Sequence, residues 1–573
     1  MKKPVAITTE RVDDIPLLLA QLQRMGVQEL LDEHFPTHGN WQGLSLGDVA
    51  VVWLSHILSQ ADHRLNHVQG WLEHHLETVG VSLEQDLRGL DMSDDRLESL
   101  LRYLSKDSEW ESFEQALSQR QLQVYDLSPK RIRLDSTSVS GFWNANEEGL
   151  FQRGHSKDHR PDLPQLKLML ATLDPLGLPI ASEIVAGNCA DDPLYEPAVH
   201  QVRQTLGIRG LLYVGDCKMG SLRTRHLIQS GGDYYLCPLS KTQVSMEDLQ
   251  QYLLPVKEET VKLKAVVYDY TNGTTALIAQ GYEQVYSCKF TQDSEESTWS
   301  ERRLVVYSIA HAEAEKKALQ ARIDKTHKEL ETLNEPCRGR KPWPDLDSFV
   351  KGVENIISKN RVDCLFQLKF QEQVEQHSQR QYRNRAARVI EKRRFQVDFS
   401  LDMTAVEQQM QVLGWRVYAT NHPQTELSLC EAVIVYRQEY LIERGFGRLK
   451  GQPLSLRPMF LQREDHIKGL IRLLTIGLRL LTLVEFQVRR ALALEKIEIA
   501  GLYAGNPKRS TAQPTTERLL TSFKEITLVL IEAKGEIYAD LTVLNPTQQR
   551  ILQLINFPIE IYTRLGPQSD DPP

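Results

Sequence analysis

Two aspartates each follow a short apolar stretch of this chain. Asp135 ends the run RIRLD, and Asp216 ends the run LLYVGD at residues 211–216. Both runs are typical of strands, and the carboxyl edge of strands in an α/β sheet is where sites usually form. Aspartate is also a common turn or cap residue after a strand. Each aspartate alone is therefore a weak indication of chemistry.

A third acid lies far along the chain, in a segment predicted to be one helix over residues 431–450. Tyr436, Glu443 and Lys450 are spaced seven residues apart in it. Seven residues are nearly two helical turns, so the three side chains are expected on one face. An amphipathic helix with a charged outer face is the simpler interpretation of this pattern.

Three carboxylates from two strands and one helix could bind hard cations. Mg²⁺ prefers oxygen ligands and usually keeps waters or substrate phosphates in its shell. Two such ions about 4 Å apart can activate a nucleophile and stabilise the leaving oxygen in phosphoryl transfer. The residues Asp135, Asp216 and Glu443 thus predict a site for two Mg²⁺ ions, with Mn²⁺ as a substitute.

The elements that must position these acids follow from the apolar patterning. Strand-like runs and helices alternate after Pro129, which predicts an α/β fold with a mixed sheet flanked by helices. The runs at 166–174 and 179–187 flank an Asp-Pro-Leu-Gly turn and predict a hairpin. The predicted divisions are a helical region 1–128, a core first part 129–240, an inserted α+β region 241–410, a core second part 411–500 and a C-terminal region 501–573.

The order strand-aspartate, strand-aspartate, long insertion and helix-glutamate resembles the DDE transposases of bacterial insertion sequences, whose core is ribonuclease H-like. The segment YRQEYLIERGFGRLK is similar to their signature of Tyr, two residues, Arg, three residues, Glu, six residues and Lys. Tyr436, Glu443 and Lys450 fall on it, whereas Glu439 replaces the arginine. The stretch GHSKDHRPDLPQLKLML (154–170) also resembles one that follows the first aspartate in related transposases.

The resemblance covers residues 129–490 and implies DNA transposition. It implies that a homodimer binds the terminal inverted repeats, nicks them to expose 3′-hydroxyls and joins these to target DNA. Asp135, Asp216 and Glu443 would hold the metals, and Tyr436 and Lys450 would contact phosphates. With Glu439 in place of the signature arginine, the alternatives are that a backbone-phosphate contact is missing or that Arg437 or Arg444 supplies it.

Charge is unevenly distributed along the chain, which carries a net charge of −8. Residues 301–400 sum to +6 and residues 441–520 to +7, so a polyanion can be held locally. Arg383, Arg385 and Arg388 form a candidate DNA track, the alternative being a solvated basic helix paired with neighbouring glutamates. Residues 1–130 sum to −10, which leaves a hidden basic face or a role in protomer assembly as alternatives.

Other classes of protein fit the sequence less well. The apolar stretch 470–494 contains five charged residues, so a packed helix is expected and not a membrane span. The seven cysteines form no CxxC pair, and His63 and His67 have no further ligands beside them, so we expect free thiols in a bacterial cytoplasm and no zinc site. A structure-selective nuclease and a non-catalytic DNA-binding descendant of a transposase are the two alternative functions.

Overall fold

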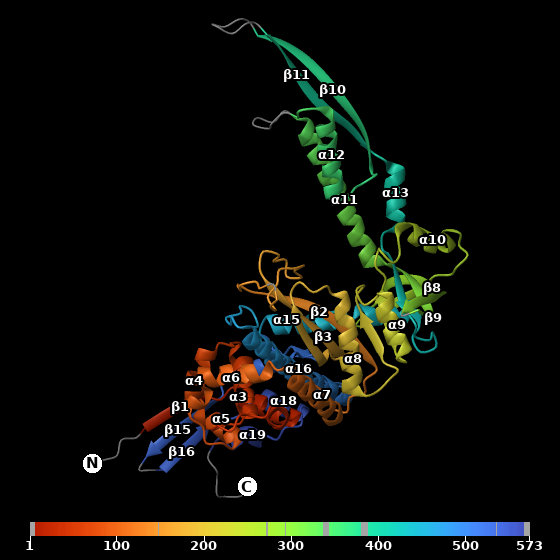
Figure 1. Cartoon of the computed structure of the whole chain (residues 1–573). Coiled ribbons are helices and arrows are strands. Elements are labelled where there is room, and N and C mark those ends of the chain that lie inside the picture. The colour runs from red at the N-terminus through yellow and green to blue at the C-terminus, as the bar shows by residue number, and fades with distance from the viewer. Residues whose placement is uncertain are drawn as a thin grey trace. The chain divides into compact units, whose positions relative to one another are not determined.

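A computed structural model describes residues 6–146, 148–270, 273–292, 294–335, 343–379, 388–533 and 536–566. The chain forms two compact units (Figure 1). Unit 1 contains residues 1–237, 290–297 and 435–573, and unit 2 contains residues 238–289 and 298–434. The segments around the three predicted acids all belong to unit 1.

The N-terminal part of unit 1 is helical, as predicted. Its third helix begins with a capping box, because Ser45 Oγ accepts from Asp48 N at 3.0 Å while Asp48 accepts from Ser45 N. The helices are α1 (Ile15–Met25), α2 (Val27–His34), α3 (Leu46–Gln60), α4 (Leu65–Glu73), α5 (Leu76–Leu83), α6 (Asp94–Leu104) and α7 (Asp107–Val124).

One strand within the N-terminal region was not predicted. β1 (Ala6–Arg11) pairs antiparallel with β15 (Thr527–Ala533), which also pairs with β16 (Glu536–Leu541). The two ends of the chain therefore share a three-stranded sheet. The other C-terminal elements are α17 (Thr516–Thr521), α18 (Pro546–Leu554), α19 (Glu560–Thr563) and the short pair β13 (Ile499–Ala500) and β14 (Ser510–Thr511).

The core sheet of unit 1 has the strand order β4-β3-β2-β5-β6. β3 and β4 form the predicted hairpin, and β2 runs antiparallel to β3 but parallel to β5. This mixed sheet, flanked by helices, confirms the predicted ribonuclease H-like α/β class. The strands are β2 (Arg131–Ser140), β3 (Gln165–Leu173), β4 (Leu178–Ala186), β5 (Leu212–Gly215) and β6 (Tyr234–Pro238).

Helices α7, α8 (Tyr195–Leu206) and α16 (Glu464–Glu495) pack against β4, and α9 (Leu222–Ser230) follows β5 in the chain. α16 contains the apolar stretch predicted to be a packed helix, and its Arg472, Arg479 and Glu485 are all buried. Among the residues that the structure describes, no helix combines the length and the apolar character needed to cross a bilayer.

Unit 2 contributes a second group of paired strands and a long ribbon. β12 (Trp415–Thr420) pairs with β9 (Glu295–Ser308), and β7 (Lys264–Asp269) pairs with β8 (Thr275–Gln292). β10 (Phe366–Gln379) and β11 (Arg388–Leu401) form an antiparallel ribbon in register throughout (Figure 1). Its helices are α10 (Met246–Lys257), α11 (Ile309–Asn334), α12 (Leu346–Asn360), α13 (Met403–Val412) and most of α14 (Leu429–Arg437).

The base of the ribbon has its own apolar core. Phe349 of α12 is fully buried and stacks against Phe395 of β11 with ring centroids 5.9 Å apart. Val397 and Val353 belong to the same buried cluster. This packing fixes the register of the ribbon, because a shift by one residue would turn these side chains to solvent.

Candidate active site

The register of two parallel strands places the two predicted aspartates side by side. Leu134 of β2 lies opposite Gly215, the last residue of β5. The next residue on each strand is an aspartate, so Asp135 and Asp216 occupy neighbouring positions at the same edge of the sheet. The prediction that both aspartates lie at strand ends is confirmed for Asp216, which directly follows β5, and is wrong for Asp135, because β2 continues past it to Ser140.

Asp135 sits among charges of both signs. Its Oδ1 accepts from Ser136 N at 2.7 Å and from Lys157 Nζ at 3.4 Å. Burial raises the pKa of the Asp135 carboxyl; the ammonium of Lys157 opposes this rise, and the charge of Asp216 adds to it. The charge of Lys157 outweighs that of Asp216, so the raised pKa of Asp135 reflects the cost of burying its carboxylate.

Asp216 is held by hydrogen bonds to its Oδ1. Tyr195, at the start of α8, donates its hydroxyl at 2.6 Å, and Lys218 donates its backbone N–H at 2.8 Å. The absence of a side chain at Gly215 allows this close approach, since a Cβ there would lie 2.8 Å from Met219 Sδ and 3.2 Å from the Tyr195 ring. The carboxylate is thus oriented by groups that leave its second oxygen available.

The predicted single helix over 431–450 is wrong in one respect, because the structure has two helices. α14 ends at Arg437 and α15 (Tyr440–Lys450) begins three residues later. Arg133 of β2 donates to Val435 O at 2.7 Å while it also pairs with buried Asp174. The Arg133 guanidinium thus competes for the Val435 carbonyl at the end of α14. The chain then continues through tight turns, in which Glu439 N donates to Tyr436 O.

The break between the helices changes which glutamate is coupled to the aspartates. Glu439 is half-buried just before α15, whereas Glu443 in its first turn is exposed. Burial raises the pKa of Glu439, and the charges of Asp135, Glu443 and Asp216 raise it further against the opposing charge of Arg133. Glu439 therefore belongs electrostatically to the acid cluster, although the sequence pattern placed Glu443 there.

Lys450, at the end of α15, faces the same edge of the sheet. Its ammonium donates to Thr137 Oγ1 of β2 at 2.6 Å and to Asp158 Oδ1 at 2.8 Å. Asp158 also pairs with Arg457. Burial and the nearby charge of Lys157 lower the pKa of Lys450 to about 8. A cation is thus held two residues along the strand from Asp135.

The other predicted DNA contacts lie in different surroundings. Tyr436 and Arg437 are half-buried at the end of α14. Arg444 donates to Glu485 of α16 at 2.6 Å, so its guanidinium is engaged in a structural ion pair. Arg388 is the first residue of β11, and Arg383 and Arg385 lie outside the described residues. From Arg388 onward the basic segment is a strand, so the alternative of a basic helix is wrong there.

Three residues of the site were not predicted from the sequence. Lys157 and Asp158 both lie in the stretch GHSKDHRPDLPQLKLML, which resembled related transposases but suggested no individual role. The remaining one, Tyr195, is the first residue of α8 and donates its hydroxyl to Asp216. No pattern in the sequence around Tyr195 indicates that its hydroxyl would bond the Asp216 carboxylate.

The donor set suits a hard divalent cation. Asp135 and Asp216 offer oxygen ligands, and a bound cation would offset the cost of burying the Asp135 carboxylate. Lys157, 3.4 Å from Asp135, supplies part of that positive charge. Within the described parts of the chain, no three His, Cys, Asp or Glu side chains are close enough together to hold a metal ion. Asp135 and Asp216 suit a divalent cation, but among the described residues no third carboxylate lies close enough to complete the site.

Comparison with known proteins assigns the chain to a family. The family model described as the transposase DDE domain matches residues 128–480, which is more than half of the chain. The chain therefore belongs to the DDE transposase family, whose members use divalent metal. No curated protein matches it. The cryo-EM structure of the piggyBac transposase synaptic complex with hairpin DNA is similar at a TM-score of 0.33 and 9% identity, covering 89% of this chain and 79% of that one.

Proposed function

We propose that this protein is a transposase that nicks DNA at the ends of its own element and transfers the exposed 3′-hydroxyls into target DNA. The observation that carries the proposal is the juxtaposition of Asp135 and Asp216 on adjacent parallel strands, within a chain of the DDE family. Paired carboxylates at a sheet edge suit phosphoryl transfer, which needs charge stabilisation rather than a covalent protein nucleophile.

The acids and the residues around them have separate proposed roles. Asp135 and Asp216 would hold Mg²⁺ or Mn²⁺, which when bound supplies Lewis acidity toward the phosphate oxygens and the attacking hydroxyl. Tyr195 keeps the Asp216 carboxylate oriented through its 2.6 Å hydrogen bond. Lys157 lies 3.4 Å from Asp135 and balances part of the negative charge of the acid pair.

The third carboxylate is assigned to Glu443, on the signature spacing from Tyr436 and Lys450. Glu443 is exposed in the first turn of α15, and its charge acts on Glu439, which is itself coupled to both aspartates. Glu439 is the competing residue, because its pKa responds to both aspartates. Separate substitutions of the two glutamates can therefore distinguish their roles.

Lys450 is the group best placed to contact a DNA phosphate near the scissile bond. A lysine is a point charge that positions the DNA backbone without reading sequence. In the DNA-free protein its ammonium is bound to Thr137 and Asp158. A phosphate would compete with Asp158, which retains Arg457 as an alternative partner.

Cleavage of the element's own ends tests the proposal. Purified protein is incubated with a duplex carrying the sequence that flanks its gene, in Mg²⁺, in Mn²⁺ and in EDTA. We expect 3′-hydroxyl nicks at the element boundary with either metal, followed by joining to a plasmid target. Cleavage that persists in EDTA would exclude metal-dependent chemistry. Preferential cutting of branched DNA without joining would indicate a structure-selective nuclease instead.

The basic segment that contains Arg383, Arg385 and Arg388, here called the basic arm, is the second proposed DNA contact. β11 begins at Arg388, and further along it Arg393 is exposed and only loosely paired with Glu372 at 3.4 Å. Replacing Arg383, Arg385 and Arg388 together by Ala should weaken binding equally across DNA sequences. Its salt dependence should flatten by about one slope unit for each phosphate that the variant no longer neutralises, as expected for counterion release. An unchanged slope would show that the arm does not follow the DNA backbone.

A further inference from the structure

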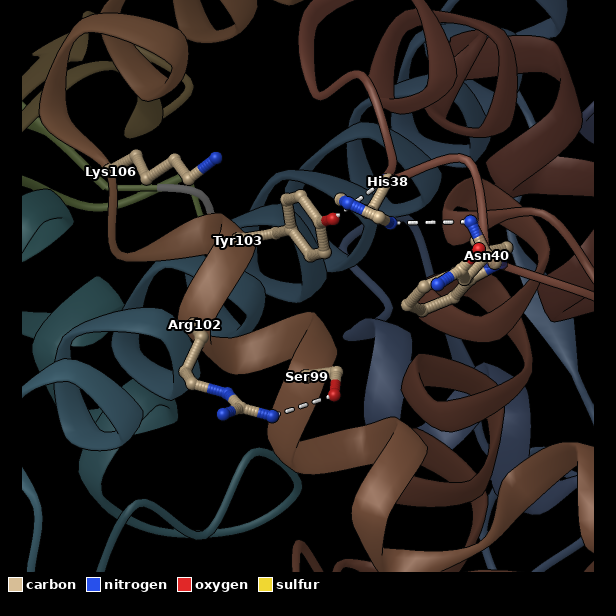
Figure 2. Close-up of a pocket in the computed structure, with 7 residues that line it drawn as sticks. His38, Asn40, Ser99, Arg102, Tyr103 and Lys106 are labelled. Carbon is tan, nitrogen blue, oxygen red and sulfur yellow. Dashed lines mark hydrogen bonds between the residues drawn. The ribbon is translucent and has the colours of Figure 1, made fainter.

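A hollow of about 460 Å³ lies in the helical N-terminal region, remote in sequence from the acids (Figure 2). One wall is the loop before α3 and the other is the end of α6 with the turn that leads into α7. Figure 2 shows His38 and Asn40 of the loop facing Tyr103 of α6. The residues that line it are His38, Asn40, Trp41, Ser99, Arg102, Tyr103 and Lys106.

Two aromatic rings form the apolar part of the hollow and are fixed in orientation. The indole N–H of Trp41 donates to Leu44 O at 2.7 Å, so the ring cannot rotate freely. Tyr103 meets Trp41 edge to face, with centroids 6.0 Å apart, and its hydroxyl accepts from His38 N at 3.0 Å. Both rings are half-buried and line the hollow, and each carries a cation over one face: Arg96 lies 5.0 Å from the centre of the Trp41 ring and Lys106 lies 4.7 Å from that of Tyr103.

The charged part of the lining is entirely basic. Arg102 and Lys106 are exposed, and Lys106 lies 4.7 Å over the Tyr103 ring. Arg102 donates to Ser99 Oγ at 2.8 Å, and Lys106 has a weak ion pair with Glu109 at 3.8 Å. None of the lining residues is an acid, although residues 1–130 as a whole sum to −10. The hollow is thus a local basic face within an acidic region.

We propose that this hollow binds an unpaired nucleotide of a DNA strand. Its base would stack on Trp41 or Tyr103, and its phosphates would contact Arg102 and Lys106. Aromatic faces accept any base, and stacking contributes about 1–3 kcal/mol per base, while nearby cations hold the backbone. The volume falls within the range of pockets for ligands of this size. The proposal rests on the proposed function, since DNA is that function's substrate.

A simple aliphatic or peptide ligand fits the lining less well. A peptide side chain would not use two flat rings and two cations together, whereas a nucleotide presents both a π-face and a phosphate. The alternative ligand is a free nucleotide, which shares the same chemistry. Comparison of an oligonucleotide with a mononucleotide distinguishes the two sources.

Binding to defined DNA probes tests the inference in the full-length protein. The probes are fluorescein-labelled dT₁₂, a blunt duplex of random sequence, and the same duplex with a four-nucleotide single-stranded end. The variants are Trp41→Ala, Arg102→Ala and Lys106→Ala, with Trp41→Phe to keep an aromatic face. The matched control is Arg88→Ala, which removes an exposed cation of the same region that does not line the hollow.

We expect each of the three alanine variants to lose about five- to tenfold in affinity for dT₁₂ and for the overhang duplex, with little change on the blunt duplex. The affinity of Trp41→Phe should stay within about twofold of that of the wild type, and Arg88→Ala should bind as tightly as the wild type. Melting by circular dichroism verifies that each variant is folded. Equal losses on all probes, or wild-type binding of dT₁₂ by Trp41→Ala and Arg102→Ala, would overturn the inference.

Two further outcomes separate this inference from the proposed function. If dTMP competes with dT₁₂ at equal concentration of nucleotide, the hollow is a free-nucleotide site and the inference about a DNA strand is wrong. If the wild-type protein binds and cuts its element's ends but the hollow variants bind dT₁₂ normally, only the inference fails. If the wild type binds neither these probes nor a duplex that carries its element's ends, the proposed function fails together with the inference.

Discussion

Carboxylates on the two sides of α15 have opposite electrostatic surroundings. Toward the sheet, Glu439 is surrounded by other acids, and its pKa is raised by burial and by the charges of Asp135, Glu443 and Asp216. Toward α16, Glu485 meets Arg444, Arg448 and Arg489, with Arg489 Nη1 2.9 Å from its Oε1. Burial acts to raise the pKa of Glu485, but these three arginines together lower it.

The difference separates a functional cluster from a structural one. The Glu485 cluster is internally neutralised, and Arg448 also donates to Glu517 at 2.6 Å, so its charges are satisfied by the folded protein itself. The cluster at Asp135 is not neutralised in this way, because contact with Lys157 does not offset the burial of Asp135, and the pKa of that carboxyl stays raised. Carboxylates left unsatisfied by the fold are suited to a cation and a phosphate that arrive from outside.

The strongest test of the comparison removes the aspartates. Asp135→Asn and Asp216→Asn should each reduce end cleavage by about 10³-fold or more, because metal binding supplies several kcal/mol of charge stabilisation. Stability should be unchanged or slightly raised, since burying a neutral amide costs less than burying a carboxylate. Cleavage kinetics and urea unfolding on the same preparations measure both. Asp162→Asn is the matched control, as Asp162 is 59% exposed and pairs with Arg160.

The second prediction decides between the two glutamates. Glu443→Gln should abolish strand cleavage in a pre-formed end complex with the fold intact, because Glu443 holds the signature position. Glu439→Gln should leave substantial activity, and Glu439→Arg, which restores the signature residue, should leave activity at least as high. A dead Glu439→Gln beside an active Glu443→Gln would show that the assigned register is wrong by one turn.

The third prediction addresses the neutralised side of α15. Glu485→Gln leaves three arginines without their shared partner, and breaking a buried pair from one side costs about 3–5 kcal/mol. Urea unfolding at pH 7 should show a decrease of about 3 kcal/mol in the free energy of unfolding. Glu29→Gln, which removes an exposed partner of Arg120, should cost less than about 1 kcal/mol.

The pH dependence of the same variant has a defined sign. The folded pKa of Glu485 is lowered, so its contribution is fully present above the unfolded pKa of about 4.3 and disappears as pH falls through the folded value. The difference in stability between wild type and Glu485→Gln should therefore shrink as pH falls below about 4.3. A difference that stays constant down to about pH 3 would show that the charge of Glu485 is not what stabilises the cluster.

Much of the fold could be predicted from the sequence. The helical region, the hairpin at residues 166–186 and the strands that carry the two aspartates have strong local patterns, and the parallel pairing of β2 with β5 brings Asp135, within β2, beside Asp216 after the end of β5. The strand β1 was missed although AITTER contains β-branched residues, because its partner β15 lies more than 500 residues away in the sequence. Such pairing depends on how the two chain ends pack.

The parts of the site that could not be predicted depend on long-range contacts. The break after Arg437 arises where Arg133, paired with Asp174, reaches Val435 O across the fold. No local signal in segment 431–450 marks it, since that segment lacks proline and its residues suit one continuous helix. The same break moves Glu439 toward the aspartates, which spacing on an ideal helix could not indicate.

The last prediction uses the lysine that borders the acid cluster. The pKa of Lys450 is lowered to about 8, mainly by burial and by Lys157, so its ammonium is mostly charged at pH 7 and mostly neutral at pH 9. If it contacts a phosphate, the affinity for the element's ends should fall about three- to tenfold over that range. Lys450→Arg stays charged and should bind with little pH dependence, and Lys450→Met should be equally insensitive but weak. Fluorescence anisotropy at constant ionic strength measures all three proteins. A wild-type curve as flat as that of Lys450→Arg would assign Lys450 to the structural side of the comparison, as a partner of Asp158 that DNA does not displace.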